Sequence, residues 1–373
     1  MFNFKQYDFK RYSIPLIVVV LILGSIGAYL IMQVQPKSEV IWHLAGLIGG
    51  ILGAIVLSLI DYHFISMFYI VLYVINLVLL ILVRVNGVTI NHAKRWLDLG
   101  FVSFQPSELT KIILIIFVAK LFSILRSKIN NFFVLLLAII SVGIPTFLIL
   151  IQTNLSTSLV IAFIFLMMIF AAGLSWKIIL PVLVLGIPIV MGLFWYIQQD
   201  YQVLLKPYQQ ERVLSMINPE EYPDTMFQQD ISVRAIGSGR LYGKTLETSG
   251  SDTRSYDYLP ISESDFIFAV AGEEFGFLGC CLILALYAVI IYICIITAKQ
   301  APDYMGMLIA VGLASMFMFQ VFVNIGVATQ ILPNTGIPLP FMSSGLSSML
   351  SGMMAVGILL NIRLQPKRSR SNN

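Results

Sequence analysis

Four carboxylates crowd one short stretch of this chain, residues 259–276, which reads LPISESDFIFAVAGEEFG. They are Glu263, Asp265, Glu273 and Glu274. The stretch leads into a long apolar run, where an ionisable side chain is costly unless it has a task. A carboxylate in such a place can accept a proton or hold a cation. Asp265 is therefore the first candidate for chemistry.

The composition shows what kind of molecule must position these carboxylates. Of 373 residues, 58% are hydrophobic and only 11% are charged. A soluble domain needs more polar surface, so we expect an all-α, polytopic integral membrane protein. Because about 20 apolar residues cross a bilayer, the apolar runs predict about ten transmembrane helices. They cover residues 14–32, 42–60, 64–83, 109–125, 132–151, 155–174, 178–197, 277–296, 304–327 and 346–362.

The distribution of basic residues predicts the orientation. With ten spans both termini lie on one side, and the positive-inside rule makes the side rich in Lys and Arg cytoplasmic. We therefore expect a multi-pass protein of the cytoplasmic membrane, with both termini in the cytoplasm and an uncleaved first span. The basic tail, residues 363–373, suits anionic membrane lipids better than nucleic acid. The short segments on the basic side carry Lys5, Lys10, Arg11, Arg126, Lys128, Lys177, Lys299, Arg363, Lys367, Arg368 and Arg370.

Three longer connections interrupt this single membrane domain, residues 1–373. Residues 84–106 form one outer loop, and residues 198–266 form a large, structured extracellular loop between helices 7 and 8. We expect short amphipathic helices in the larger loop, over residues 208–218 and 228–236, and a flexible turn at residues 237–239. Residues 328–345, rich in proline and glycine, predict an outer or re-entrant loop packed against protein.

Metal-ligand and nucleophile patterns are sparse. The three histidines, His43, His63 and His92, fall on different loops and sides, and no His/Cys spacing typical of zinc is present. The three cysteines lie inside the eighth predicted span, where they act as small apolar residues. The residues therefore point to carboxylate chemistry rather than zinc or thiol chemistry.

Five motifs, in order along the chain, resemble one family. The chain resembles the SEDS proteins (shape, elongation, division and sporulation), and most of all their RodA branch. The motifs are NHAKRW with FVSFQPSELTK (91–111), YQQERV (208–213), AIGSG (235–239), SDFIFAVAGEEFGFLG (264–279) and NTGIPLPFMSSG (334–345).

The resemblance implies a peptidoglycan glycosyltransferase that polymerises lipid II at the extracellular face. It implies a class B penicillin-binding protein as partner, other proteins of cell-wall elongation or division, and a glycan linked to polyprenyl pyrophosphate as the second substrate. Asp265 matches the family's essential aspartate. Two alternatives stay open: a flippase for the lipid-linked precursor, and a scaffold without catalytic activity.

Glycan polymerisation sets the chemistry of the site. A sugar hydroxyl attacks an anomeric carbon while a pyrophosphate leaves, so a carboxylate must accept a proton and cations must stabilise the leaving group. We expect Asp265 to be the general base, directly or through a divalent cation such as Mg²⁺ or Mn²⁺, with a pKa raised by partial burial. The structural alternative is an N-terminal helix cap.

Three cations are candidates for phosphate binding: Lys111, Arg212 and Arg95. Each has a local alternative. Lys111 follows Glu108 by three residues and could form an ion pair with it, Arg212 could be a solvated charge, and Arg95 could anchor the loop at the interface beside Trp96. Glu108 enters the predicted substrate site as the partner of Lys111.

The remaining candidates are weaker. Glu273 is a possible assistant at the site, Glu274 is assigned to structure, and Ser343 is predicted either to contact substrate or to satisfy loop backbone. The chain also departs from the family pattern, because Asn154 occupies a position that is commonly acidic. A salt bridge from that position to Lys111 is not available.

Overall fold

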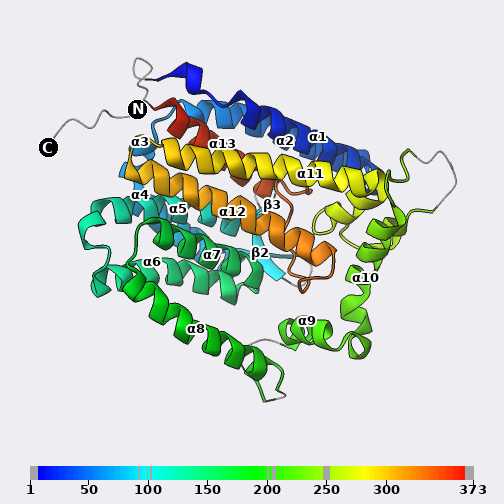
Figure 1. The fold of residues 1–373 in the computed structure, drawn as a ribbon. Coiled ribbons are helices and arrows are strands. Elements are labelled where there is room, and N and C mark those ends of the chain that lie inside the picture. Colours follow the sequence, from blue (N-terminus) through cyan, green and yellow to red (C-terminus); the bar gives the residue numbers. More distant parts are fainter. Residues whose placement is uncertain are drawn as a thin grey trace.

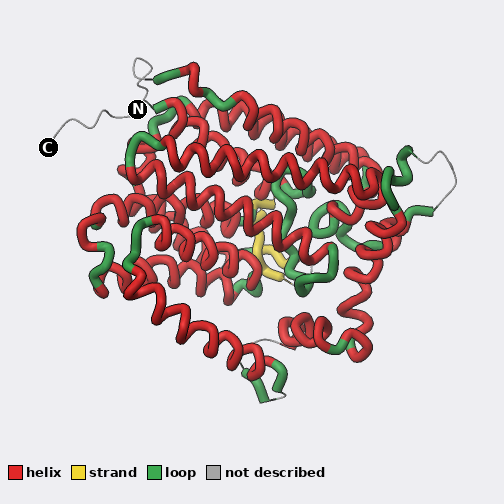
Figure 2. Tube along the Cα trace, viewed as in Figure 1, coloured by secondary structure: helices red, strands yellow, loops and turns green. Residues whose placement is uncertain are grey.

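The computed structural model describes residues 7–90, 93–98, 100, 103–199, 201–203, 207–246 and 253–365. Helices account for most of these residues, and the predicted all-α membrane fold is confirmed (Figures 1 and 2). The basic tail beyond residue 365, and Asn91 and His92 of the first motif, lie outside the described residues. The long helices are α1 (Ile14–Val34), α2 (Lys37–Ser58), α4 (Tyr69–Asn86), α5 (Pro106–Ile124), α6 (Phe132–Ile151), α7 (Leu155–Ala171), α8 (Trp176–Ile197), α11 (Ile267–Gln300), α12 (Tyr304–Ala328) and α13 (Leu346–Leu364).

Every predicted span corresponds to a helix. Within the described residues, eight helices are long and apolar enough to cross a membrane. The other two predicted spans are α5, which carries charged residues, and α7, which has 17 residues. The third predicted span is divided into the short α3 (Tyr62–Met67) and α4. The predicted start of the eighth span at residue 277 was wrong, because α11 begins at Ile267.

The centre of the bundle is built from α5, α12 and α13. Helix α13 packs along α2, and α12 packs against α5, α7 and α11 (Figure 1). Most side chains of α5, α12 and α13 are therefore buried, polar ones included. Helix α8 stands apart from the bundle, and none of its described side chains is buried. An apolar helix exposed on all sides is suited to contact with lipid.

The large outer loop contains both predicted helices, and one of them is longer than predicted. Helix α9 (Pro207–Ile217) matches the predicted amphipathic helix, whereas α10 (Pro223–Ser238) extends well beyond residues 228–236. The turn predicted at residues 237–239 was wrong in part, because Gly237 and Ser238 continue α10, which ends at Gly239. Short 3-10 helices at Pro219–Glu221 and Ser255–Tyr258 complete the described part of the loop.

A break in α11 anchors this outer loop. Gly276 has φ +65°, and a Cβ at that position would lie 2.4 Å from the backbone nitrogen of Gly243. Only glycine allows this conformation and close approach. The loop supplies partners for backbone groups around the break: Phe277 N donates to Arg240 O (2.8 Å), Leu278 N to Leu241 O (3.2 Å), Lys244 N to Glu273 O (2.9 Å) and Thr245 N to Glu274 O (3.1 Å).

The outer loop at residues 84–106 forms a small sheet that was not predicted. Strands β1 (Val88–Ile90), β2 (Ala93–Asp98) and β3 (Ser103–Phe104) pair antiparallel in the order β1-β2-β3. The sheet leads directly into α5, whose first turn follows β3. It thereby places Arg95 and Trp96 of β2 close to the start of α5.

Candidate functional site

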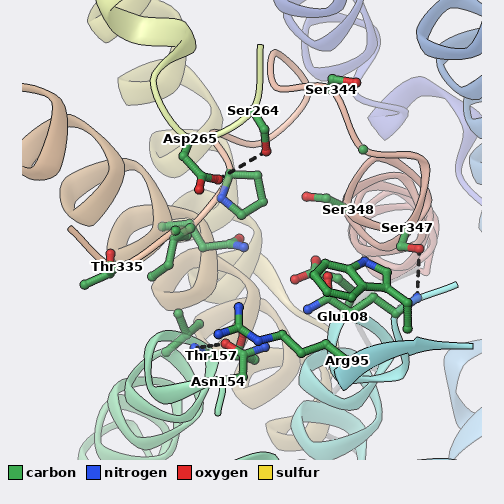
Figure 3. Close-up of a pocket in the computed structure, with 18 of the residues that line it drawn as sticks. Arg95, Glu108, Asn154, Thr157, Ser264, Asp265, Thr335, Ser344, Ser347 and Ser348 are labelled. Atoms are coloured by element: carbon green, nitrogen blue, oxygen red, sulfur yellow. Dashed lines mark hydrogen bonds between the residues drawn. The ribbon is translucent and has the colours of Figure 1, made fainter. Parts of the chain in front are cut away.

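A cavity of about 280 Å³ opens where the outer loops meet the ends of the central helices. Ligand pockets usually have volumes of about 300–1,000 Å³, so this one suits part of a large substrate. Figure 3 shows Asp265 and Ser264 on one wall, with Arg95 and Asn154 facing them. The structure brings together five of the predicted residues, which supply all the charged groups in the described lining: Asp265, Arg95, Arg212, Lys111 and Glu108.

Asp265 lies two residues before the start of α11 and is partly exposed to the cavity. Its Oδ1 accepts a hydrogen bond from Ser264 Oγ at 3.1 Å. Among the described residues, no side chain caps α11, whose N-cap position is Phe266. The carboxylate of Asp265 therefore faces the cavity rather than the backbone of the helix.

The surroundings of Asp265 make its carboxyl group more basic. Burial raises the pKa of Asp265, while the hydrogen bond from Ser264 and the positive charges of Arg212 and Arg95 lower it in part. The net direction is upward, as expected from the sequence. A carboxylate with a raised pKa is a better proton acceptor and still ionises when the pH exceeds that pKa.

Two loops fix the position of Asp265. The Nδ2 of Asn324, on α12, donates to Asp265 O at 2.9 Å and to Ile337 O at 2.8 Å. Gly336 has φ +68°, and a Cβ there would lie 3.1 Å from Asp265 Oδ2. The main chain at this glycine therefore closes tightly over the carboxylate.

Ser343 joins the same two loops by hydrogen bonds. Its Oγ donates to Ser264 O at 2.5 Å and accepts from Leu339 N at 2.8 Å. Ser343 is 4% exposed and is not among the described residues that line the cavity. Of its two predicted roles, the structure shows the one that satisfies loop backbone.

Lys111 and Glu108 form a buried ion pair in the cavity wall. Lys111 Nζ lies 2.9 Å from Glu108 Oε1 and 2.8 Å from Oε2. The local ion pair considered as an alternative for Lys111 is therefore present, and the pair also lines the cavity. Neither charge would be tolerated here without the other, because an unpaired charge is costly in a buried site.

Arg95 and Arg212 supply the positive wall from two different loops. Arg95, on β2, donates to Thr153 O at 2.5 Å, and Arg212, on α9, donates to Asn334 O at 3.1 Å. These bonds to main-chain carbonyls hold both guanidinium groups at the cavity. Planar guanidinium groups are suited to bind phosphate oxygens in pairs.

Comparison with known proteins identifies the family. The family of FtsW, RodA and SpoVE, described as "Cell cycle protein", matches residues 11–368. The chain belongs to this family. The resemblance to SEDS proteins is thereby confirmed, because the family model matches nearly the whole length of this SEDS protein.

Individual relatives agree with this assignment. This SEDS protein is similar to stage V sporulation protein E of Bacillus subtilis (39% identity over 295 residues, 78% of this chain and 77% of the relative). It is also similar to peptidoglycan glycosyltransferase MrdB of Escherichia coli K12 (36% over 299 residues, 79% and 78%). A solved structure concerning polymerization and crosslinking by a peptidoglycan synthase complex matches with TM-score 0.79 and 29% identity, covering 96% of this chain and 97% of the other. Because proteins of different branches match about equally well, the RodA branch stays a prediction.

Glu273 and Glu274 lie outside the cavity of this SEDS protein. Both are almost fully buried and bind the outer loop to α11. The structure therefore gives Glu273 the structural role that was predicted only for Glu274. Glu273 accepts from Lys244 Nζ (2.5 Å), Ser255 N (2.8 Å) and Tyr256 N (3.1 Å), and Glu274 accepts from Tyr256 Oη (2.6 Å) and Arg254 Nε (2.9 Å).

Several cavity residues were missed by the sequence analysis. They are the uncharged polar residues Gln320, Thr335, Ser347 and Ser348. A signal existed for Gln320, because a primary amide inside the apolar run 304–327 is costly and marks a functional position. No comparable signal existed for the others, since serine and threonine are common in loops and helix ends.

The cavity offers little to a metal ion. Within the described residues, no group of three or more His, Cys, Asp and Glu side chains could hold one. The carboxylates of the described lining are Asp265 and Glu108, and Glu108 is paired with Lys111. A Mg²⁺ ion would therefore take one carboxylate from the protein and its other ligands from water or substrate phosphates, an arrangement that Mg²⁺ accepts.

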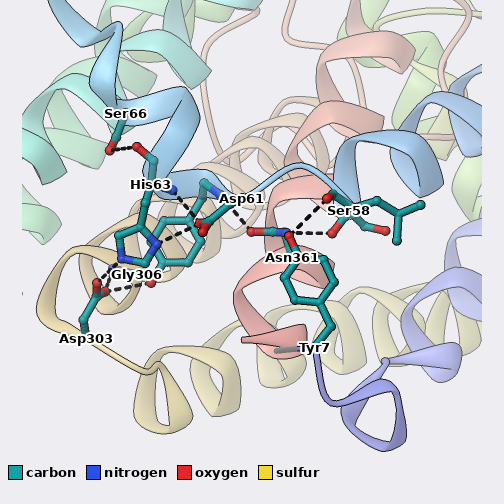
Figure 4. Close-up of polar contacts among 10 residues, drawn as sticks. Tyr7, Ser58, Asp61, His63, Ser66, Asp303, Gly306 and Asn361 are labelled. Carbon is teal, nitrogen blue, oxygen red and sulfur yellow. Dashed lines mark hydrogen bonds and ion pairs between the residues drawn. The ribbon is translucent and has the colours of Figure 1, made fainter. Parts of the chain in front are cut away.

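A second polar cluster lies at the opposite end of the bundle, around His63 (Figure 4). His63 Nδ1 lies 2.8 Å from Asp61 Oδ1, and Nε2 lies 2.6 Å from Asp303 Oδ2. Burial lowers the pKa of His63, but the two carboxylates outweigh it and raise the pKa to about 9. Asn361 connects the cluster to α13 by accepting from Tyr62 N at 2.9 Å.

Proposed function

We propose that this SEDS protein is a peptidoglycan glycosyltransferase that polymerises lipid II into glycan strands, with Asp265 as the general base. The observation that carries the proposal is a carboxylate of raised pKa facing a cavity whose other wall holds Arg95 and Arg212. The name of the relative MrdB, a peptidoglycan glycosyltransferase, supports this enzyme class.

The proposed reaction uses each charged group of the cavity. The acceptor sugar's 4-hydroxyl oxygen attacks the anomeric carbon of the donor, and its proton passes to Asp265. The new glycosidic bond forms as the bond between that carbon and the pyrophosphate oxygen breaks. Arg95 and Arg212 stabilise the negative charge on the departing polyprenyl pyrophosphate. Lys111, held by Glu108, adds a further positive group to the same wall.

If a divalent cation such as Mg²⁺ or Mn²⁺ takes part, Asp265 would be the protein carboxylate that holds it. Such an ion would supply additional positive charge to the leaving group. The proton transfer to Asp265 and the contacts of Arg95 and Arg212 do not depend on it.

We propose that the cavity opens on the extracellular side of the cytoplasmic membrane and that both termini are cytoplasmic. The two described ends of the chain lie together, since Asp8 N donates to Leu364 O at 2.9 Å. Leu364 ends α13, whose other end contributes Leu346, Ser347 and Ser348 to the cavity. The basic residues near the termini favour the cytoplasm for that end.

We also propose a class B penicillin-binding protein as partner. The structural match to a study of a peptidoglycan synthase complex, in which polymerization and crosslinking are coordinated, supports a transpeptidase partner for this chain.

The decisive experiment incubates the purified chain and its class B partner with labelled lipid II and separates the glycan products on a gel. We expect glycan chains from the native protein and none from Asp265→Ala. The matched control is Asp257→Ala, eight residues earlier, on an exposed part of the same loop. Glycan synthesis by Asp265→Ala would contradict the role of this residue. Translocation of lipid II across vesicles without polymerisation would support the flippase, and neither activity would support the scaffold.

A further inference from the structure

Gln320 is the glutamine that lines the cavity among those buried in the described structure. It lies on α12, is 3% exposed and lines the cavity. Among the described residues, no hydrogen-bond partner is found for its side-chain amide. Other polar residues line the same cavity. By contrast, Gln229 Nε2 donates to Val327 O at 2.9 Å and Leu332 O at 2.8 Å, and Gln152 Nε2 donates to Leu80 O at 2.9 Å.

The fold gains nothing from an amide at this position. A polar group in an apolar helix is costly when nothing in the protein binds it, and the amide of Gln320 faces the cavity instead of a partner in the fold. A leucine of similar size would pack in α12 without that cost. Polar groups inside membrane helices mark functional positions, and this one points to a ligand that enters the cavity.

The position of Gln320 relates it to Asp265. Gln320 lies one turn of α12 before Asn324, whose amide binds Asp265 O. One turn of helix is about 5.4 Å long, so Gln320 lies about that far deeper in the bundle than this bridge. Val160 and Lys111 line the same cavity, and they lie on helices that pack against α12. Gln320 therefore belongs to the inner part of the cavity.

A hydroxyl group enclosed behind the cavity wall also lacks a partner. Thr335 Oγ1 is fully buried, and no hydrogen bond to it is found among the described residues. Thr335 lines the cavity from the loop before α13, and its main-chain oxygen is fixed by Ser156. The cavity thus has uncharged hydrogen-bonding groups in addition to its charged wall.

We propose that Gln320 forms a subsite for the acetamido group of an N-acetylated sugar. A primary amide presents both a donor and an acceptor, so its best neutral complement is another amide. The charged groups Arg95, Arg212 and Lys111 suit phosphates, which leaves the uncharged subsite for a neutral part of the substrate. This inference rests on the proposed function, because lipid II carries one acetamido group on each of its two sugars.

The test measures dissociation constants for lipid II and for two analogues, each with one acetamido group replaced by a hydroxyl group. It uses the Asp265→Asn background, in which binding is read without turnover. We expect Gln320→Leu to weaken lipid II binding roughly 10-fold, the effect of leaving one partner of a buried hydrogen bond unsatisfied. The analogue that lacks the contacted acetamido group should bind equally well to the Asp265→Asn protein with and without Gln320→Leu. That analogue identifies the sugar that Gln320 contacts.

An equal loss of affinity for lipid II and both analogues on Gln320→Leu would overturn the proposal, as would unchanged binding of lipid II. The measurement is independent of polymerisation. Failure of the proposed function would appear as absent glycan synthesis by the native chain, whereas failure of the subsite would appear as absent coupling between Gln320 and either acetamido group.

Thermal stability separates this role from a structural one, with Gln229→Leu as the matched control. We expect Gln320→Leu to keep or raise the Tm, because the substitution removes a polar group without a protein partner. Gln229→Leu removes two hydrogen bonds to main-chain carbonyls and should lower the Tm. A similar fall in Tm for both variants would show that Gln320 serves the fold, and would overturn the proposal.

Discussion

The two ends of the bundle hold similar residue types in opposite states. Around His63, both ring nitrogens have carboxylate partners, and Asp303 also accepts from Tyr62 Oη at 2.8 Å and Gly306 N at 2.7 Å. In the cavity, the carboxylate of Asp265 accepts from its neighbour Ser264 and faces open space. A cluster whose groups satisfy one another stabilises the fold, whereas polar groups that face a cavity are available to a substrate.

The contacts of the His63 cluster give it a structural role. It joins the turn between α2 and α3 to the start of α12, and Asn361 extends it to α13 by donating to Ser58 O at 2.7 Å. Three segments distant in the sequence are thereby fixed at one end of the bundle (Figure 4). Substitutions at the two ends should therefore separate activity from stability.

The largest effect is expected from Asp265→Asn. Removing a general base should lower kcat about 10²–10⁴-fold. The thermal stability should be unchanged or higher, because the charged form of a carboxylate with a raised pKa is disfavoured by folding. Polymerisation rates and a thermal melt check both parts.

The pH profile of the native protein provides a further check on Asp265. Activity requires the deprotonated carboxylate, so the rate should fall as the pH drops through its raised pKa, which lies above the usual value of about 3.9. An acid limb at or below that usual value would contradict the raised pKa.

The next effect is expected at the buried ion pair. Lys111→Met should lower the free energy of unfolding by about 3–5 kcal/mol, because it leaves Glu108 charged and without its partner in a buried site. The double variant Lys111→Met/Glu108→Leu should recover most of that stability, since both charges are removed. Chemical unfolding measures the difference. A double variant that is stable and fully active would show that the pair serves the fold only.

A smaller effect, on stability alone, is expected from His63→Gln. The pKa of His63 is about 9 in the folded protein and about 6.5 in an unfolded chain, so its contribution is complete below about pH 6.5 and is lost as the pH rises to about 9. Because the side chain is 28% exposed, we expect about 2 kcal/mol rather than the full value of the shift. Melts of both proteins across that pH range should converge at high pH, while activity per folded molecule is unchanged.

The sequence predicted the helices well because their signal is local. Apolar runs of membrane length located every span, and the amphipathic helix predicted over residues 208–218 ends within one residue of α9. The true start of α11 was missed because Gly276, which looks like the boundary of an apolar run, is a break within the helix that the outer loop closes. Such a contact between segments distant in the sequence has no local signature.

The site was predicted in part for the same reason. Charged residues in apolar surroundings are conspicuous, so Asp265 and Lys111 were found, and the structure places them in one cavity with Arg212, which was named from the amphipathic loop helix. Glu273 was equally conspicuous, but its partners come from the loop at residues 244–256, which the sequence could not place beside it. The charge signal therefore finds costly residues without telling substrate contacts from internal anchors.

The smallest effect is expected from Asn154→Asp, which restores the acidic residue common in the family. Asn154 caps α7 by accepting from Thr157 N at 3.2 Å, and aspartate is an equally good cap, so the capping contact should be kept. Lys111 already has Glu108 as its partner and does not need a second carboxylate.

We therefore expect the polymerisation rate of Asn154→Asp to stay within about 10-fold of the native rate, because Lys111 keeps Glu108 as its partner and the cap of α7 is retained. The control is Asn154→Ala, which removes the cap and should lower the Tm. A larger change in rate for Asn154→Asp would show that the polymerisation rate depends on the charge at this position. The activity at the cavity end would then depend on its charges more strongly than the comparison with the His63 end indicates.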